Sequence, residues 1–186
     1  DYDRYGSFFA KAVLQDFTAE GAFVSRTKGI PTGSFGTDFN DRGNKTKDEH
    51  AYVDFKYDRT FNGQTDLSAR LYYDYYRYTG DYLYGGVINR DKSAGDWGGG
   101  EVRFSKRIAG THRVIAGAEY QGNQRQNQEN YDVAPYFSYM PEDVRKSHLW
   151  AVYIQDEVAL LEKFVLNAGV RYDHYSTFGG TTNPRL

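Results

Sequence analysis

The sequence predicts an all-β protein, an antiparallel transmembrane β-barrel. Two observations in residues 147–175 lead to this prediction. First, apolar and polar side chains alternate: Trp150, Val152 and Ile154 share one side of a strand, and charged Glu157 falls on the other. Second, each predicted strand is about a dozen residues long, against a usual ~5–6. Long strands that are apolar on one face and charged on the other suit a barrel in a membrane.

The composition agrees with such a barrel. The chain has 186 residues, a formal net charge of −2, 18 tyrosines, 12 phenylalanines and a mean hydropathy of −0.76. Only alternate residues of a barrel strand meet lipid, so low hydropathy is expected, and aromatic rings collect at the membrane interfaces. No run of about 18 apolar residues predicts a membrane-spanning helix. The chain has no cysteine, and its near-neutral charge gives no reason to expect nucleic acid as a partner.

About eight strands follow from the alternation. We expect them at residues 6–15, 18–28, 47–60, 65–78, 97–108, 112–123, 147–159 and 164–175. Short turns join the strands in pairs, and one of these turns contains Asn62-Gly63, a strong hairpin signal. Long polar segments separate the pairs, and we expect extracellular loops at 29–46, 79–96 and 124–146.

The connections indicate the kind of barrel. Short turns and long loops alternate strictly, as in outer-membrane barrels with short periplasmic turns. Eight strands could close into a small complete barrel. Here, however, both ends of the chain fall on the long-loop side, and residues 176–186 are expected to begin a fourth loop. We therefore interpret the chain as a segment of a larger barrel.

Three ordered motifs resemble a known family. The stretches YIQDE (153–157), LNAGVRYD (166–173) and NPR (183–185) are similar to motifs that recur in this order in TonB-dependent outer-membrane receptors. The resemblance implies a 22-stranded barrel around an N-terminal plug domain of the same parent chain, located in the bacterial outer membrane. It also implies active import of a scarce nutrient, powered by a TonB-type energising protein that contacts a missing N-terminal part. Neither plug nor TonB-contacting segment is recognisable in these 186 residues.

Charged residues on the polar faces are expected to line the lumen, where they would solvate the wall and hydrogen-bond the plug. These lumen residues are Arg70, Asp74, Glu101, Arg103, Glu119, Glu157, Arg171 and Asp173, with Asp54 and Lys56 on the same faces. The run Gly98-Gly99-Gly100 is expected to let bulky neighbours pack on the wall.

Ligand binding is expected in the loops, which carry function on a rigid scaffold. Aromatic and cationic side chains there suit an anionic, ring-bearing ligand such as a ferric siderophore. The candidates are Tyr82, Tyr84, Arg90, Arg125, Tyr131 and Tyr136.

The sequence favours neither catalysis nor a resident cofactor. Asp38, Asn40, Gly43 and Glu49 follow part of a calcium-loop pattern, but Arg42 stands where an oxygen ligand should be. The four histidines lack metal-ligand spacing. We therefore expect no bound metal, no cofactor and no enzymatic activity. Two alternatives to a receptor stay open, a passive porin-like or small structural barrel and a soluble β-sandwich.

Overall fold

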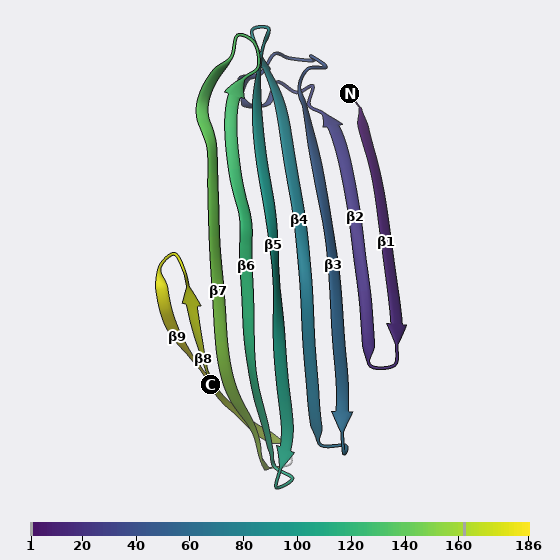
Figure 1. Cartoon of the computed structure of the whole chain (residues 1–186), viewed down its shortest axis with the longest axis vertical. Helices are drawn as coiled ribbons and strands as arrows, with labels where there is room; N and C mark the ends of the chain where they lie inside the picture. Colours follow the sequence, from purple (N-terminus) through teal and green to yellow (C-terminus); the bar gives the residue numbers. More distant parts are fainter. Residues whose placement is uncertain (1, 162) are drawn as a thin grey trace.

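The computed structural model describes residues 2–161 and 163–186, which form one antiparallel sheet of nine strands (Figure 1). Each strand pairs with its neighbours in the chain, and β1 and β9 are the two edges. The strands are β1 (Asp3–Leu14), β2 (Phe17–Gly29), β3 (Lys45–Phe61), β4 (Thr65–Tyr84), β5 (Val87–Ile108), β6 (His112–Asp132), β7 (Phe137–Leu161), β8 (Phe164–Tyr175) and β9 (Gly179–Arg185). No helix in the described part of the chain is long and apolar enough to cross a membrane.

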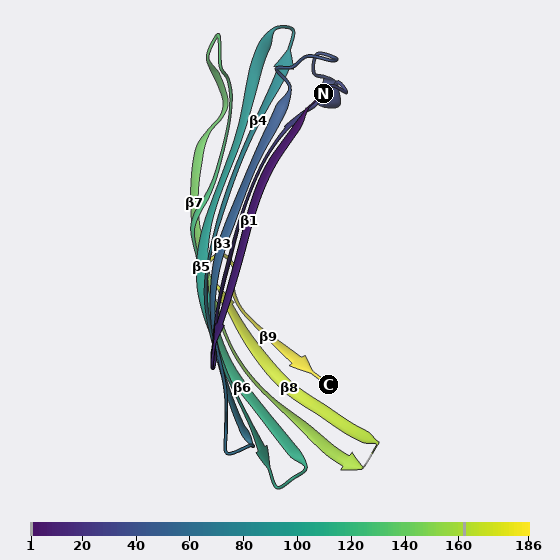
Figure 2. The same cartoon turned by 90° about the vertical axis from the view of Figure 1, so that its right-hand side faces the viewer.

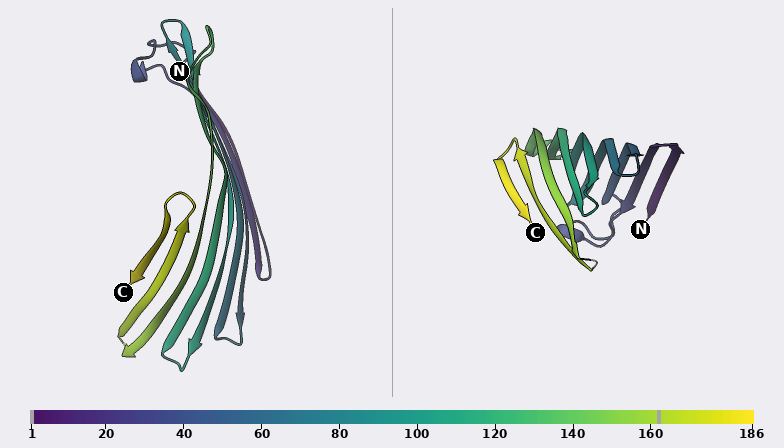
Figure 3. Two further views of the ribbon diagram at one scale, coloured as in Figure 1. Left: turned by 60° about the vertical axis from the view of Figure 1, so that its left-hand side comes forward. Right: turned by 90° about the horizontal axis from the view of Figure 1, so that it is seen from below.

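The sheet curves into an arc, open between β1 and β9 (Figures 2 and 3). The all-β barrel architecture expected from the sequence is confirmed, with nine strands in place of about eight. The ninth strand lies in residues 176–186, which we expected to begin a loop. Pro184 and five neutral residues hide its pattern, yet Arg171 pairs with Asn183 in the β8–β9 register.

The position of the loop between β2 and β3 identifies the residues that face the concave side of the sheet. This loop contains the short 3₁₀ helix η1 (Ser34–Gly36) and folds over the concave side of the arc (Figure 2). There the ring of Phe35 packs edge-on against Tyr82, with 5.8 Å between ring centroids. Since side chains alternate along a strand, the even-numbered residues of β4 that share the face of Tyr82, such as Arg70 and Asp74, face the concave side.

The opposite, convex face carries the apolar side chains. The register aligns Leu71 of β4 with Gly100 of β5, and Val102 with Ala118 of β6. These apolar residues are exposed, as Leu71 (66%) and Ile154 (53%) illustrate. In the described residues Ala151 is the one fully buried apolar residue, so the sheet encloses no core of its own. A β-sandwich would bury this apolar face under a second sheet, and the described residues form a single sheet.

Two of the three expected long loops are wrong. Residues 79–96 continue β4 and β5 around a turn at Gly85-Gly86, and residues 124–146 continue β6 and β7 around residues 133–136. Both turn glycines have positive φ (56° and 87°), which glycine adopts without strain. The physical reason is that these strand ends rise beyond the apolar belt. Polar side chains occupy both faces there, so the alternation disappears while the backbone ladder continues.

The third expected loop is observed, between Gly29 and Lys45. Its anchor is Asn44, which is fully buried. The Asn44 side chain donates to the Asp38 carbonyl (2.7 Å) and accepts from the Leu83 amide (2.7 Å). The Asp38 carboxylate in turn accepts from the amides of the β4–β5 turn. The loop is therefore fixed to the end of the neighbouring hairpin.

Candidate functional site

The concave wall collects the charges that the sequence assigned to the lumen. The register places Arg70, Glu101 and Glu119 in one row across β4, β5 and β6, and Arg103 and Arg171 in the next row. By the same register and alternation, all eight expected lumen residues lie on this face: Arg70, Asp74, Glu101, Arg103, Glu119, Glu157, Arg171 and Asp173.

Arg171 is the centre of an ion-pair cluster on this wall. Its Nη2 donates to Glu119 (2.8 Å), two strands away, and its Nε donates to Asp173 (2.7 Å) on its own strand. Asp173 is only 5% exposed and accepts a second bond from Asn183 of β9 (3.0 Å). The guanidinium therefore joins β6 to β8 with charge-assisted hydrogen bonds, and Asp173 extends the network to β9.

Other members of the set are paired more locally. Arg70 forms an ion pair with Asp54 of β3, and Asp74 contacts His50 (3.3 Å). Glu157 lies 3.6 Å from Arg113. Paired charges of this kind stabilise a wall that water reaches, and they present alternating donors and acceptors to whatever occupies the concave side.

Glycines on the concave face allow tyrosines to lean across the strands. The Tyr153 ring lies over Gly117, where an added Cβ would come within 2.4 Å of it, and the phenol donates to Glu101 (2.8 Å). Tyr72 lies over Gly99 in the same way and donates to Gln121 (2.9 Å). Each phenol thus crosses the neighbouring strand, which carries the glycine, and reaches the strand beyond it. The glycine run predicted such packing, but the sequence does not show which tyrosine uses it.

A shallow cavity of about 490 Å³ opens on this part of the wall. Its charged and polar lining includes Glu101, Arg103, Tyr153, Gln155 and Arg171. The lining offers both acceptors and donors, and Ile115, Ile154 and Val170 line it beside them. Such a surface can hydrogen-bond a polar solute or a polar protein domain inside the arc.

The six ligand candidates do not converge on one site. Tyr82 and Tyr84 occupy concave-facing positions at the end of β4. Arg90 and Tyr131 face each other across β5 and β6 on the convex side. Arg125 also lies on the convex side, and Tyr136 lies in the β6–β7 turn, with its ring 5.7 Å from Tyr131.

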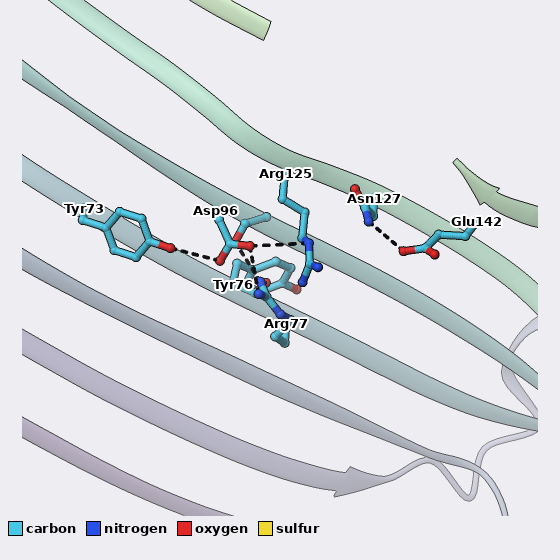
Figure 4. Close-up of polar contacts among 8 residues, drawn as sticks. Tyr73, Tyr76, Arg77, Asp96, Arg125, Asn127 and Glu142 are labelled. Atoms are coloured by element: carbon cyan, nitrogen blue, oxygen red, sulfur yellow. Dashed lines mark hydrogen bonds and ion pairs between the residues drawn. The ribbon is translucent and has the colours of Figure 1, made fainter. Parts of the chain in front are cut away.

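Arg125 belongs to a cluster around Asp96 on the convex face (Figure 4). The Asp96 carboxylate accepts from Arg77 (2.8 Å) and from the phenol of Tyr73 (3.4 Å), and it lies 3.7 Å from Arg125. A bulge between Asp96 and Trp97 turns these side chains. The cluster marks the level at which the apolar belt gives way to a polar surface.

The residues of the calcium-like pattern have structural contacts. Asp38 caps the β4–β5 turn through the amides of Gly85 (3.0 Å) and Gly86 (3.2 Å). Glu49 belongs to β3 and pairs with Lys47 (2.9 Å). Within residues 2–161 and 163–186 no group of three or more His, Cys, Asp or Glu side chains is arranged to hold a metal ion.

Comparison with known proteins identifies the family. A family model described as "TonB dependent receptor-like, beta-barrel" matches residues 1–186. Among solved structures, the chain is similar to the ferric citrate transporter FecA in its unliganded form (TM-score 0.66, 16% identity, 98% of this chain and 32% of that chain). It is also similar to a G324V mutant of the ferric enterobactin receptor PfeA from Pseudomonas aeruginosa (TM-score 0.68, 12% identity, 98% and 30%).

At these identities the two structures establish the fold alone, and the chain spans about a third of the length of each. No curated protein matches the chain. The family model covers every residue, and it agrees with the three ordered motifs and with the apolar convex face. The chain belongs to the TonB-dependent receptor family, as part of its β-barrel.

Proposed function

We propose that this chain is part of the wall of a bacterial outer-membrane receptor that actively imports a scarce nutrient, with a ferric siderophore or another iron complex as the cargo. The observation that carries the proposal is the division of one sheet into an exposed apolar convex face and an ion-paired concave face. The two similar structures are a ferric citrate transporter and a ferric enterobactin receptor, which supports iron complexes as the cargo.

In this proposal the apolar belt contacts outer-membrane lipid, and the concave wall faces a plug domain of the same parent chain. The Arg171 cluster and the tyrosines over Gly99 and Gly117 then form the hydrogen-bonding surface against the plug. A TonB-type protein supplies the energy through another part of the parent chain. No catalytic group is needed, since transport moves the cargo without changing its covalent bonds.

Tyr82 and Tyr84 are the strongest candidates for ligand contact among the six. Both face the concave side at the loop end, and Tyr82 already packs against Phe35 of the covering loop. A ring of this kind stacks on an aromatic iron chelator. The convex position of Arg90, Arg125 and Tyr131 separates them from this surface.

The decisive experiment measures uptake of a labelled iron complex by iron-starved cells with and without the full-length protein. Uptake should depend on the protein and stop when an uncoupler collapses the proton-motive force. Uptake that survives the uncoupler would instead favour a passive channel. For the ligand contact, the affinity of Tyr82→Ala for the iron complex should fall about tenfold, whereas Tyr82→Phe, which keeps the ring, should bind like the wild type.

A further inference from the structure

The convex face carries a basic groove near the loop end of the sheet, on the side opposite the concave wall. It has a volume of about 840 Å³. Its cationic lining residues are Arg4, Arg42, Lys45, Lys47, Arg90 and Lys92, and a single carboxylate, Asp81, lines it with them.

The strand register explains why these cations gather. One row across the sheet reads Arg4, Thr27, Lys47, Thr79 and Lys92, from β1 to β5. Long basic side chains alternate with short threonines in this row, which leaves room between the basic groups.

The next row towards the loop end holds Lys45, Asp81 and Arg90, with Gly29 beside Lys45. Gly29 has no side chain, and the ring of Tyr2 lies above it. The groove is thus a product of two neighbouring rows rather than of one sequence segment.

The carboxylates around the groove neutralise only part of its charge. Asp81 pairs with Arg90 (2.6 Å) and Lys45 (3.4 Å). Lys92 pairs with Glu129 (2.8 Å), and Lys47 pairs with Glu49 (2.9 Å).

Three carboxylates therefore face six cations. Within residues 2–161 and 163–186, neither Arg4 nor Arg42 forms an ion pair. The Lys47 and Lys92 side chains also stay 49% and 41% exposed, which leaves their donors accessible to a bound anion. The groove carries a surplus of about three positive charges.

The height of the groove matches the headgroups of a lipid layer. The row of Phe8 and Phe23 belongs to the apolar belt, and Arg4 lies four residues further along β1. Four residues span about 13 Å of strand, or about 9 Å of height for a strand tilted by about 45°. The headgroup region adds about 5–8 Å to each side of the hydrocarbon core, and long basic side chains bridge the remaining distance.

We propose that this groove binds the phosphate-bearing headgroup of a lipid in the outer leaflet of the membrane around the barrel. The inference rests on the outer-membrane placement in the proposed function. The groove opens towards the lipid and away from the lumen, so a transported solute has no reason to enter it. Guanidinium groups bind phosphate in a bidentate manner, and clustered lysines add charge.

The test titrates the purified full-length protein with bisphosphorylated lipid A in detergent and measures the dissociation constant. The double variant Arg4→Gln, Lys47→Gln removes two cations from the groove. Its binding should weaken about thirtyfold, the loss expected for two basic side chains at an anionic membrane surface. The matched control is Lys28→Gln, because Lys28 neighbours Thr27 on β2 but faces the concave side.

The control should bind lipid A like the wild type, and neither phosphatidylcholine nor inorganic phosphate at millimolar concentration should compete. Equal affinity of wild type and double variant, or an equal loss in Lys28→Gln, would overturn the inference. Full competition by inorganic phosphate would identify a free anion as the occupant and would also overturn it. Failure of the proposed function has a different signature: the wild-type protein would then import no iron complex, whatever its affinity for lipid A.

Discussion

Replacing Arg171 with alanine should destabilise the barrel wall more than replacing any other single cation on the concave face. The substitution breaks two charge-assisted hydrogen bonds, to Glu119 (2.8 Å) and to Asp173 (2.7 Å). Each such bond contributes about 1.5–3 kcal/mol. Glu119 is partly solvated and belongs at the low end of this range, whereas nearly buried Asp173 belongs at the high end.

The sum, about 4.5 kcal/mol, falls within the ~3–5 kcal/mol typical of breaking a buried ion pair. Water reaches the Arg171 side chain, which is 36% exposed, so the expected loss in free energy of unfolding is reduced to about 2–3 kcal/mol. The matched control is Arg185→Ala on β9, an exposed cation that faces the same side; it should cost less than about 0.5 kcal/mol.

The assay is urea unfolding of the full-length protein in lipid vesicles, followed by tryptophan fluorescence. Adding Asp173→Asn to Arg171→Ala should recover about 1 kcal/mol, since the amide carries no stranded charge. A loss in Arg171→Ala no larger than in Arg185→Ala would refute the reasoning, because the cluster would then be too well hydrated to stabilise the wall.

Three further predictions concern the glycines under the tyrosine rings, the covering loop and a partly buried carboxyl. Gly99→Ala places a methyl group 2.3 Å from the carbonyl oxygen of Tyr120 and should cost about 1–3 kcal/mol in the same unfolding assay. Gly6→Ala, with open space around it, should leave the free energy of unfolding unchanged. Equal effects of the two substitutions would contradict the close packing at Gly99. Asp38→Ala removes the acceptor for two turn amides, so limited proteolysis should cut the loop at 30–44 faster than in the wild type. An unchanged cleavage rate would show that the carboxylate does not fix the loop. Burial raises the pKa of Asp91, above the apolar belt on β5, despite a hydrogen bond from Asn130. The neutral form of the Asp91 carboxyl is favoured in the folded state, so its contribution to stability is present below its unfolded pKa and is lost as the pH rises through the folded pKa. Asp91→Asn should therefore stabilise the protein more at pH 7 than at pH 4. A difference in stability between variant and wild type that does not change with pH would exclude this effect.

The sequence predicted the parts of the fold that short-range patterns encode. Residues 164–175 form a strand because Leu166, Ala168 and Val170 alternate with polar neighbours, and Asn62-Gly63 turns the chain with positive φ at both residues (50° and 66°). The same alternation separates the lumen charges from the lipid face. Where polar side chains occupy both faces, as in 79–96, the pattern gives no signal, and the strands there were missed.

What the tertiary structure alone decided is which distant side chains meet. Tyr153 reaches Glu101, 52 residues away, and Arg4 shares a row with Lys92, because hairpin registers accumulate from strand to strand across the sheet. The sequence by itself determined the strand segments that cross the apolar belt, the two faces and the family, since a period of two and the ordered motifs are written in consecutive residues. The Arg171 cluster, the tyrosines over glycine and the basic groove depend on register and curvature, which no single stretch of residues contains.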